Sequence, residues 1–344
     1  RQRQMCIRDS YIIKLSVRAT CYRIEDFMDK PTLAVIIPCY NEELCIEKTV
    51  NKLFEVINSL IEKNKITPNS YLYLVDDGSS DKTWEIIERL HAENKLVKAQ
   101  KFIRNYGNQK ALIAGLEGVR EIGCDCVVSI DADLQQDEWA IEKFVYEYMN
   151  GFDVVSGIRN DRKTDSIFKK TTALLFYKIM NILGVKIPVN HSDYRLISKK
   201  ALELMSQYHE NALFLRGFFH ELGLKTAYVH FDVKQRMAGT SKFNFVKLLE
   251  LSLNGITSFS IVPLRFISLL GFLMALFGFV VGLEAVYEKI FHNNAPNGMA
   301  TTIILLCVFG GIQIFCLGII GEYVGQVFRE VKARPRYIKE TELK

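Results

Sequence analysis

A pair of carboxylates ends one of the apolar runs in the first half of the chain. Asp131 and Asp133 close the segment CVVSIDAD, residues 126–133, and Gln135 follows two positions later. Carboxylate and amide oxygens are hard ligands of the kind that Mg²⁺ and Mn²⁺ prefer, and these ions usually bind substrate phosphates as well. Asp-x-Asp pairs also arise by chance in loops, but the position directly after an apolar strand favours a metal site.

A second acidic pair, Asp76 and Asp77, ends the apolar segment of residues 71–77 and is followed by Gly-Ser-Ser-Asp. Glycine and serine after two aspartates are typical of a turn, and Asp81 at its end could cap a helix. The two carboxylates could instead accept hydrogen bonds from a nucleobase or a ribose. The sequence leaves both interpretations open.

Strand-length apolar runs alternate with longer amphipathic segments from residue 33 onward. In the first long segment, Ile46, Val50, Leu53, Ile57 and Leu60 recur at helical spacing. Strands separated by helices predict an α/β fold with a mostly parallel, doubly wound sheet, which binds ligands at the carboxyl ends of its strands. The strands are expected at residues 33–38, 71–77, 97–103, 126–133 and 154–159, with a helix at 109–121.

Several classes of protein are disfavoured by missing motifs. No Gly-x-Gly-x-x-Gly follows the first strand and no Gly-Lys-Ser/Thr loop occurs, which argues against a dinucleotide oxidoreductase and a P-loop ATPase. No nucleic-acid motif accompanies the net charge of +5, so no nucleic-acid partner is expected. The eight cysteines are expected to be reduced thiols, because the chain is too large for a disulfide-stapled secreted domain.

Two uncharged runs near the C-terminus, Phe266–Leu283 and Thr301–Gly321, are each about 20 residues long, which is the length needed to cross a bilayer. A pair of buried core helices is the alternative, but soluble helices of this length seldom lack a charged face. Glycines in both runs would allow close helix contacts and leave room for a homo-oligomer. Basic residues concentrate after the second run, which predicts that this end and the N-terminal domain face the cytoplasm.

These features predict five segments. An N-terminal extension, residues 1–27, is expected to carry no part of the fold or function, because Met28, shortly before the first strand, would be a natural start. The α/β domain is expected at 28–242 and an interfacial amphipathic segment at 243–263. A transmembrane hairpin at 264–328, with helices at 264–287 and 301–323, and a basic cytoplasmic tail at 329–344 complete the chain.

Five motifs occur in chain order, and together they resemble those of the family 2 glycosyltransferases with a GT-A fold. Within that family the pattern is similar to the polyprenyl-phosphate glycosyltransferases, the group of bactoprenol glucosyltransferase and dolichol-phosphate mannose synthase. Processive synthases would show a Gln-x-x-Arg-Trp motif, which this chain lacks. The motifs are Pro38-Cys39-Tyr40-Asn41-Glu42, Asp76-Asp77-Gly78-Ser79-Ser80-Asp81, Asn105-Tyr106-Gly107, Asp131-Ala132-Asp133-Leu134-Gln135 and Arg236-Met237-Ala238-Gly239-Thr240-Ser241-Lys242.

The resemblance implies a role for each matching residue. The nucleotide-sugar pocket is expected to be lined by Pro38, Tyr40, Glu42, Asp76, Asp77 and Asp131. The metal, Mg²⁺ or Mn²⁺, is expected on Asp131, Asp133 and Gln135, with Asp133 and Asp193 as the catalytic residues. The acceptor phosphate is expected to contact Arg159, Arg195, Arg236 and Lys242. Tyr194 stands where the family usually has Phe, and His191 where a small residue is more common.

The expected reaction is the inverting transfer of a hexose from a nucleotide sugar, such as UDP-glucose, to undecaprenyl or dolichyl phosphate at the cytoplasmic membrane face. A bound metal ion would stabilise the charge on the leaving diphosphate. The attacking lipid phosphate, with a second pKa near 6, needs no strong base, so Asp193 is expected to orient the acceptor or the sugar, with base catalysis as a secondary role. The alternatives are a transferase for another lipid or glycan and a non-catalytic membrane scaffold that senses nucleotide sugars.

Overall fold

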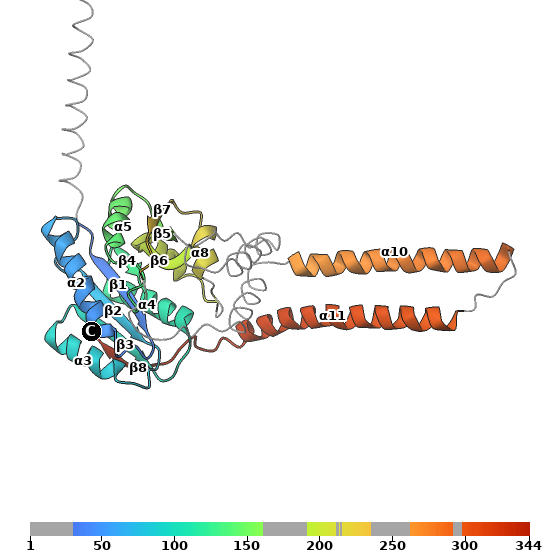
Figure 1. Cartoon of the computed structure of the whole chain (residues 1–344), viewed down its shortest axis with the longest axis horizontal. Coiled ribbons are helices and arrows are strands. Elements are labelled where there is room, and N and C mark those ends of the chain that lie inside the picture. Colours follow the sequence, from blue (N-terminus) through green and yellow to red (C-terminus); the bar gives the residue numbers. More distant parts are fainter. Residues whose placement is uncertain (1–29, 161–190, 211–212, 214, 235–261, 292–297) are drawn as a thin grey trace, which may run out of the picture.

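The computed structural model describes residues 30–160, 191–210, 213, 215–234, 262–291 and 298–344. These residues form an α/β domain and two long helices that extend away from it (Figure 1). The predicted fold class is confirmed, since the sheet is mostly parallel and helices cover both of its faces.

Eight strands of the described residues make one sheet in the order β7-β5-β6-β4-β1-β2-β3-β8. Strand β6 runs antiparallel to both of its neighbours, β4 and β5, and β8 runs antiparallel to β3. The other neighbouring pairs are parallel. The strands are β1 (Leu33–Cys39), β2 (Tyr71–Asp76), β3 (Val97–Phe102), β4 (Cys126–Ser129), β5 (Val154–Arg159), β6 (His191–Ser198), β7 (Thr226–Phe231) and β8 (Lys339–Leu343).

Strand β1 shows why the central strands are apolar throughout. Leu33, Val35 and Ile37 pack on the face covered by α2, α3 and α5, while Ala34 and Ile36 pack on the face covered by α4, α7 and α8. A strand that is buried on both faces reads as a continuous apolar run and not as an alternating one. The covering helices are α2 (Ile46–Glu62), α3 (Thr83–Glu93), α4 (Asn108–Ile122), α5 (Ala140–Met149), α7 (Lys199–Met205) and α8 (Leu215–Glu221).

The predicted strands and the helix expected at 109–121 agree with the observed elements to within one or two residues, except for the strand expected at 126–133. Strand β4 ends at Ser129, and the acidic motif that follows is a loop. Leu134 in this loop has a φ of 54°, a left-handed conformation that a strand cannot contain. The carbonyl of Ala132 accepts a hydrogen bond from Thr49 Oγ1 at 2.7 Å, which ties the loop to α2.

Two described helices, α10 (Val262–Phe291) and α11 (Met299–Val331), are long and apolar enough to cross a bilayer. The candidate spans are Val262–Glu284, with a mean hydropathy of 2.5, and Val308–Val331, with a mean hydropathy of 1.6. Neither span is buried inside the protein, which removes the alternative of two core helices. The helices run antiparallel beside each other (Figure 1).

The C-terminal residues are not the separate tail that the sequence predicts. Strand β8 adds to the sheet on the open edge of β3. Just before β8, Arg336 Nη1 forms an ion pair with Glu117 Oε1 of α4 at 2.9 Å. The ring of Tyr337 stacks on the ring of Phe102, with 4.8 Å between the ring centroids. Arg336, one of the basic residues after the second apolar run, therefore pairs with a carboxylate of the α/β domain.

Two predicted segments lie outside the described residues. The N-terminal extension, residues 1–27, is one of them. The interfacial segment, residues 243–263, is the other, except for its last two residues, which begin α10.

Candidate functional site

The loops that follow β1 and β2 are joined by reciprocal hydrogen bonds. The backbone N–H of Asn41 donates to Ser79 Oγ at 2.9 Å, and the N–H of Ser80 donates to Asn41 Oδ1 at 2.8 Å. Gly78 has a φ of 67°, and a Cβ there would lie 2.3 Å from the backbone of Arg104. Only glycine fits this turn. The loops after β1 and β2 and the segment after β3 are therefore packed closely against one another.

Asp76 and Asp77 are both buried, and both hold backbone turns. Asp76 accepts hydrogen bonds from the N–H and the hydroxyl of Ser79, and burial raises its pKa. Asp77 accepts from the N–H groups of Tyr106 and Gly107, at 2.6 and 2.8 Å, one on each carboxylate oxygen. Burial raises the pKa of Asp77 to about 6. These contacts favour a role for Asp77 in shaping the loop ahead of α4 over direct contact with a nucleotide.

The loop after β4 carries the expected metal ligands. Asp133 Oδ1 accepts from the N–H of Gln135 at 3.1 Å, and Asp131 is held by Gln136, which lies one residue beyond the motif. Among the described residues, no three histidine, cysteine or acidic side chains converge as a metal cluster. Two carboxylates and an amide still fit Mg²⁺ or Mn²⁺, because such ions take one or two protein carboxylates and complete their shell with substrate phosphates and water.

The C-terminal end of this loop is held in place by a backbone hydrogen bond and by ion pairs. The N–H of Lys234, just beyond β7, donates to the carbonyl of Gln135 at 2.8 Å. Lys234 Nζ lies 2.6 Å from Glu138 Oε2, and Lys52 Nζ of α2 lies 3.3 Å from Glu138 Oε1. These cations lower the pKa of the buried Glu138 carboxyl against the opposing effect of desolvation, which keeps it ionised.

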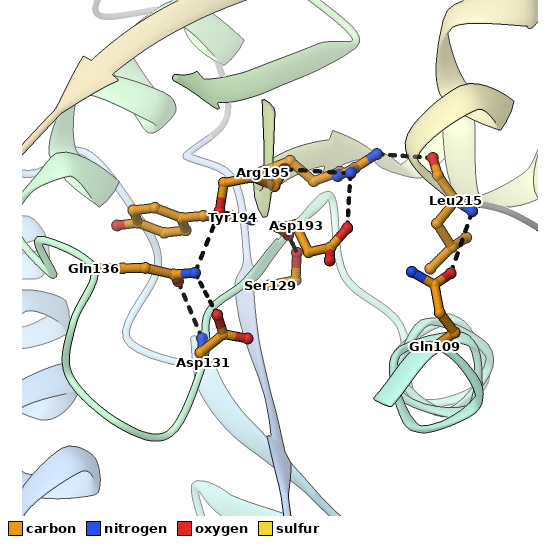
Figure 2. A network of polar contacts seen from close by, with 9 residues as sticks. Gln109, Ser129, Asp131, Gln136, Asp193, Tyr194, Arg195 and Leu215 are labelled. Atoms are coloured by element: carbon orange, nitrogen blue, oxygen red, sulfur yellow. Dashed lines mark hydrogen bonds and ion pairs between the residues drawn. The ribbon is translucent and has the colours of Figure 1, made fainter. Parts of the chain in front are cut away.

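Asp193 lies on β6, next to the strand that leads into the metal loop. Its carbonyl accepts from Ser129 Oγ of β4 at 2.5 Å, and its carboxylate Oδ1 lies 3.2 Å from Arg195 Nη2 (Figure 2). Because β6 is antiparallel to β4, the start of β6 lies beside the end of β4, at the carboxyl ends of the parallel strands. The structure therefore brings Asp193 beside the Asp131 loop, although the two are far apart in sequence.

Arg195 is placed differently from the expectation that it contacts an acceptor phosphate. Its side chain is only 3% exposed. The guanidinium donates to the carbonyl of Leu215 at 2.9 Å and to that of Ser192 at 3.3 Å, in addition to its contact with Asp193 (Figure 2). These contacts favour a role for Arg195 in positioning Asp193 and α8 over the expected contact with an acceptor phosphate.

The remaining expected residues divide into two groups. Pro38 is buried, Tyr40 and Glu42 are half-buried after β1, and Arg159 is exposed at the end of β5, which is the same edge of the sheet. Arg236 and Lys242 lie outside the described residues.

Sequence reasoning missed the residues that hold the site together. Gln136, Ser129 and Ser192 have no spacing signal that separates them from ordinary loop and strand residues. The acidic Glu138, three residues after the motif, was the one visible sign of an anchored loop.

Comparisons with known proteins match both parts of the chain. A family model described as glycosyl transferase family 2 matches residues 34–205, and one described as GtrB C-terminal hairpin matches residues 262–327. The uncharacterized glycosyltransferase YkoT of Bacillus subtilis is 45% identical over 91% of this chain and 93% of that protein. The prophage bactoprenol glucosyl transferase homolog of Escherichia coli is 36% identical over 89% of this chain and 97% of that protein.

A viral relative and a solved structure complete the comparison. The bactoprenol glucosyl transferase of Shigella phage SfX is 35% identical over 89% of this chain and 98% of that protein. Glucosyl-3-phosphoglycerate synthase from Mycobacterium tuberculosis, crystallised with Mn²⁺ and UDP-glucose, aligns with a TM-score of 0.44 and 20% identity over 66% of this chain and 78% of that one.

Proposed function

Since the chain belongs to glycosyltransferase family 2, we propose that it transfers a hexose from a nucleotide sugar to a polyprenyl phosphate at the cytoplasmic face of a membrane. The observation that carries the proposal is the meeting of the Asp131 loop and Asp193 at one edge of the sheet, inside one hydrogen-bonded network. Relatives named bactoprenol glucosyl transferase support a lipid phosphate as acceptor and glucose as the first sugar to test.

The donor would lie across the carboxyl ends of β1, β2 and β4. Tyr40 and Glu42, half-buried after β1, would face its nucleoside, while Asp131, Asp133 and Gln135 would hold a divalent ion next to its diphosphate. When bound, that ion would stabilise the negative charge that develops on the leaving diphosphate. The carboxylates alone would repel the diphosphate, so the donor site depends on a cation between the two.

Asp193 would orient the acceptor phosphate or the sugar for the reaction. An oxygen of the lipid phosphate would form the new bond to the anomeric carbon as the bond to the nucleoside diphosphate breaks, which inverts the configuration. A phosphate dianion carries no proton that must be removed, so this step needs no general base. The ion pair with Arg195 keeps the Asp193 carboxylate fixed in place for this task. Arg159, Arg236 and Lys242 remain the proposed cations for the acceptor phosphate.

The membrane arrangement follows from the two apolar helices. We infer that α10 and α11 cross the bilayer once each. Basic residues at and after the end of α11 favour the cytoplasm for the α/β domain and the C-terminus. These residues are Arg329, Lys332, Arg334 and Arg336.

The proposal is tested with the purified full-length protein, a panel of labelled nucleotide sugars, polyprenyl phosphate and Mn²⁺ or Mg²⁺. At least one donor should deliver label to the organic phase. Asp133→Asn should lower this transfer about 100-fold or more, since a metal ion contributes several kcal/mol to such a transition state. Glu142→Gln, which removes an exposed carboxylate paired with Lys63, is the matched control and should transfer like the wild type. No transfer from any donor would contradict the proposal and favour a non-catalytic role.

A further inference from the structure

Gln136 has an unusual set of contacts for a residue outside the metal motif. Its side chain is almost fully buried, with 2% of the residue exposed. Its Oε1 accepts from the backbone N–H of Asp131 at 3.1 Å, and its Nε2 donates to Asp131 Oδ2 at 2.6 Å and to Ser192 Oγ at 3.4 Å (Figure 2). The amide therefore grips both the backbone and the carboxylate of Asp131.

The orientation of this amide is determined by its partners. A backbone N–H can only donate, so the group that faces it must be Oε1, and Nε2 is left to face the carboxylate. The backbone of Gln136 is also fixed, because it bridges to Val233 in an antiparallel pair next to the hydrogen bond from Lys234 N–H to Gln135 O. Gln136 is thus held in place through both polar atoms of its side chain and through its main chain.

A second buried glutamine provides an internal comparison. Gln100 on β3 is 0% exposed, and neither its Nε2 nor its Oε1 has a hydrogen-bond partner among the described residues. Burial alone therefore does not give a glutamine of this domain a set of partners. The contacts of Gln136 are specific to the Asp131 loop and to β6.

We propose that Gln136 is a positioning residue that fixes the carboxylate of Asp131 for the divalent ion and links the metal loop to the strand that carries Asp193. The proposal rests on the metal-dependent transfer proposed above. Hydrogen bonds to a ligating carboxylate set its orientation, and loss of such a partner typically lowers metal affinity 10–100-fold. Through Ser192, which lies next to Asp193, the same amide ties the donor-side carboxylate to the proposed acceptor side.

The test is a titration of the full-length protein in detergent with Mn²⁺ and a nucleoside diphosphate, followed by the electron paramagnetic resonance signal of free Mn²⁺. Gln136→Met, which keeps the volume but removes both polar atoms, should weaken Mn²⁺ binding about 10-fold or more. Gln100→Met is the matched control and should bind Mn²⁺ like the wild type. Ser192→Ala leaves the contact between Gln136 and Asp131 in place and should also retain Mn²⁺ affinity.

Activity provides a second readout that a loss of general stability would not reproduce. Transfer by Gln136→Met should be restored largely by excess Mn²⁺, because the defect lies in metal affinity. If Gln136→Met does not fold, Gln136→Asn, which keeps the amide but shortens its reach by one methylene, should weaken Mn²⁺ binding in the same direction.

Wild-type Mn²⁺ affinity in Gln136→Met, or an equal loss of affinity in Gln100→Met, would overturn the proposal. A wild-type protein that binds no Mn²⁺ together with the nucleotide would instead contradict the metal dependence of the proposed function, so the two failures are distinguishable.

Discussion

At the scale of single residues, the candidate site consists of carboxylates whose hydrogen-bond and ion-pair partners could not be predicted from the sequence. The position of Asp131, Asp133, Asp76 and Asp77 at strand ends was predictable, because apolar runs mark the strands. The partners were not, since the direction of a side chain on β6 depends on strands and helices that are distant in sequence. Arg195 illustrates this limit, because only the structure places the Leu215 carbonyl of α8 at its guanidinium.

Asp77 should make stability depend on pH. Its pKa is raised from 3.8 to about 6 in the folded protein, so the folded state binds the proton more tightly than the unfolded state. Its contribution to stability is therefore greatest below about pH 4 and is lost as the pH rises to about 6. The apparent Tm of the wild type should fall relative to that of the neutral variant Asp77→Asn across this window and run parallel to it above pH 7. A constant Tm difference throughout would contradict the burial argument.

Arg195→Met should be strongly destabilising because it leaves the largely buried Asp193 carboxylate without the cation that pairs with it. Removal of one partner from a buried ion pair typically costs about 3–5 kcal/mol. Arg89→Met is the control, since Arg89 and Glu47 form an arginine–carboxylate ion pair at 2.7 Å with both side chains about half exposed. That substitution should cost less than about 1 kcal/mol. Denaturant or thermal unfolding of the two variants decides between this account and one in which Arg195 is free to bind a ligand.

At the scale of elements, the sequence predicted β1 to β5 and missed β6, β7 and β8. Strand β6 is buried on both faces of the sheet but reads HSDYRLIS, in which polar residues interrupt the apolar pattern, while β8 reads KETEL and has almost no apolar residues. An edge strand such as β8 is stabilised by backbone pairing with β3 and by nearby side chains, which composition does not reveal.

The contacts of Tyr337 should hold β8 and the end of α11 on the α/β domain. The ring stacks on Phe102, and the hydroxyl donates to Glu117 Oε2 at 2.5 Å. Tyr337→Ala should therefore destabilise the domain by about 2 kcal/mol, the order expected for an aromatic pair and a hydrogen bond to a carboxylate. Tyr146→Ala, at a tyrosine that is 58% exposed, is the control and should leave the apparent Tm nearly unchanged. Equal losses in the two variants would show that β8 is not anchored through Tyr337.

At the scale of the whole molecule, strand pairing constrains the membrane topology. Strand β3 precedes α10 and β8 follows α11, yet the two strands are neighbours in one sheet. The α/β domain and the C-terminus must therefore lie on the same side of the membrane, with an even number of crossings between them. Composition alone located the apolar helices, but the return of the chain to the sheet was visible only in the structure (Figure 1).

Reporter fusions test this topology. A fluorescent protein that matures only in the cytoplasm should be active when fused after Lys344, and a phosphatase that is active only outside should be active when fused in the connector between α10 and α11. Phosphatase activity at the C-terminus would contradict the cytoplasmic location of the α/β domain, and the same reporter active at both fusion sites would contradict the two crossings.

The central claim is that the carboxylates at this sheet edge transfer a sugar to a lipid phosphate with the help of a divalent ion. The most direct measurement is the release of nucleoside diphosphate by the full-length protein with its best donor, compared between polyprenyl phosphate and the corresponding polyprenol, with and without a chelator. The account predicts release only with the phosphate and only while the divalent ion is present. Equal release with the alcohol, or release that survives chelation, would contradict it.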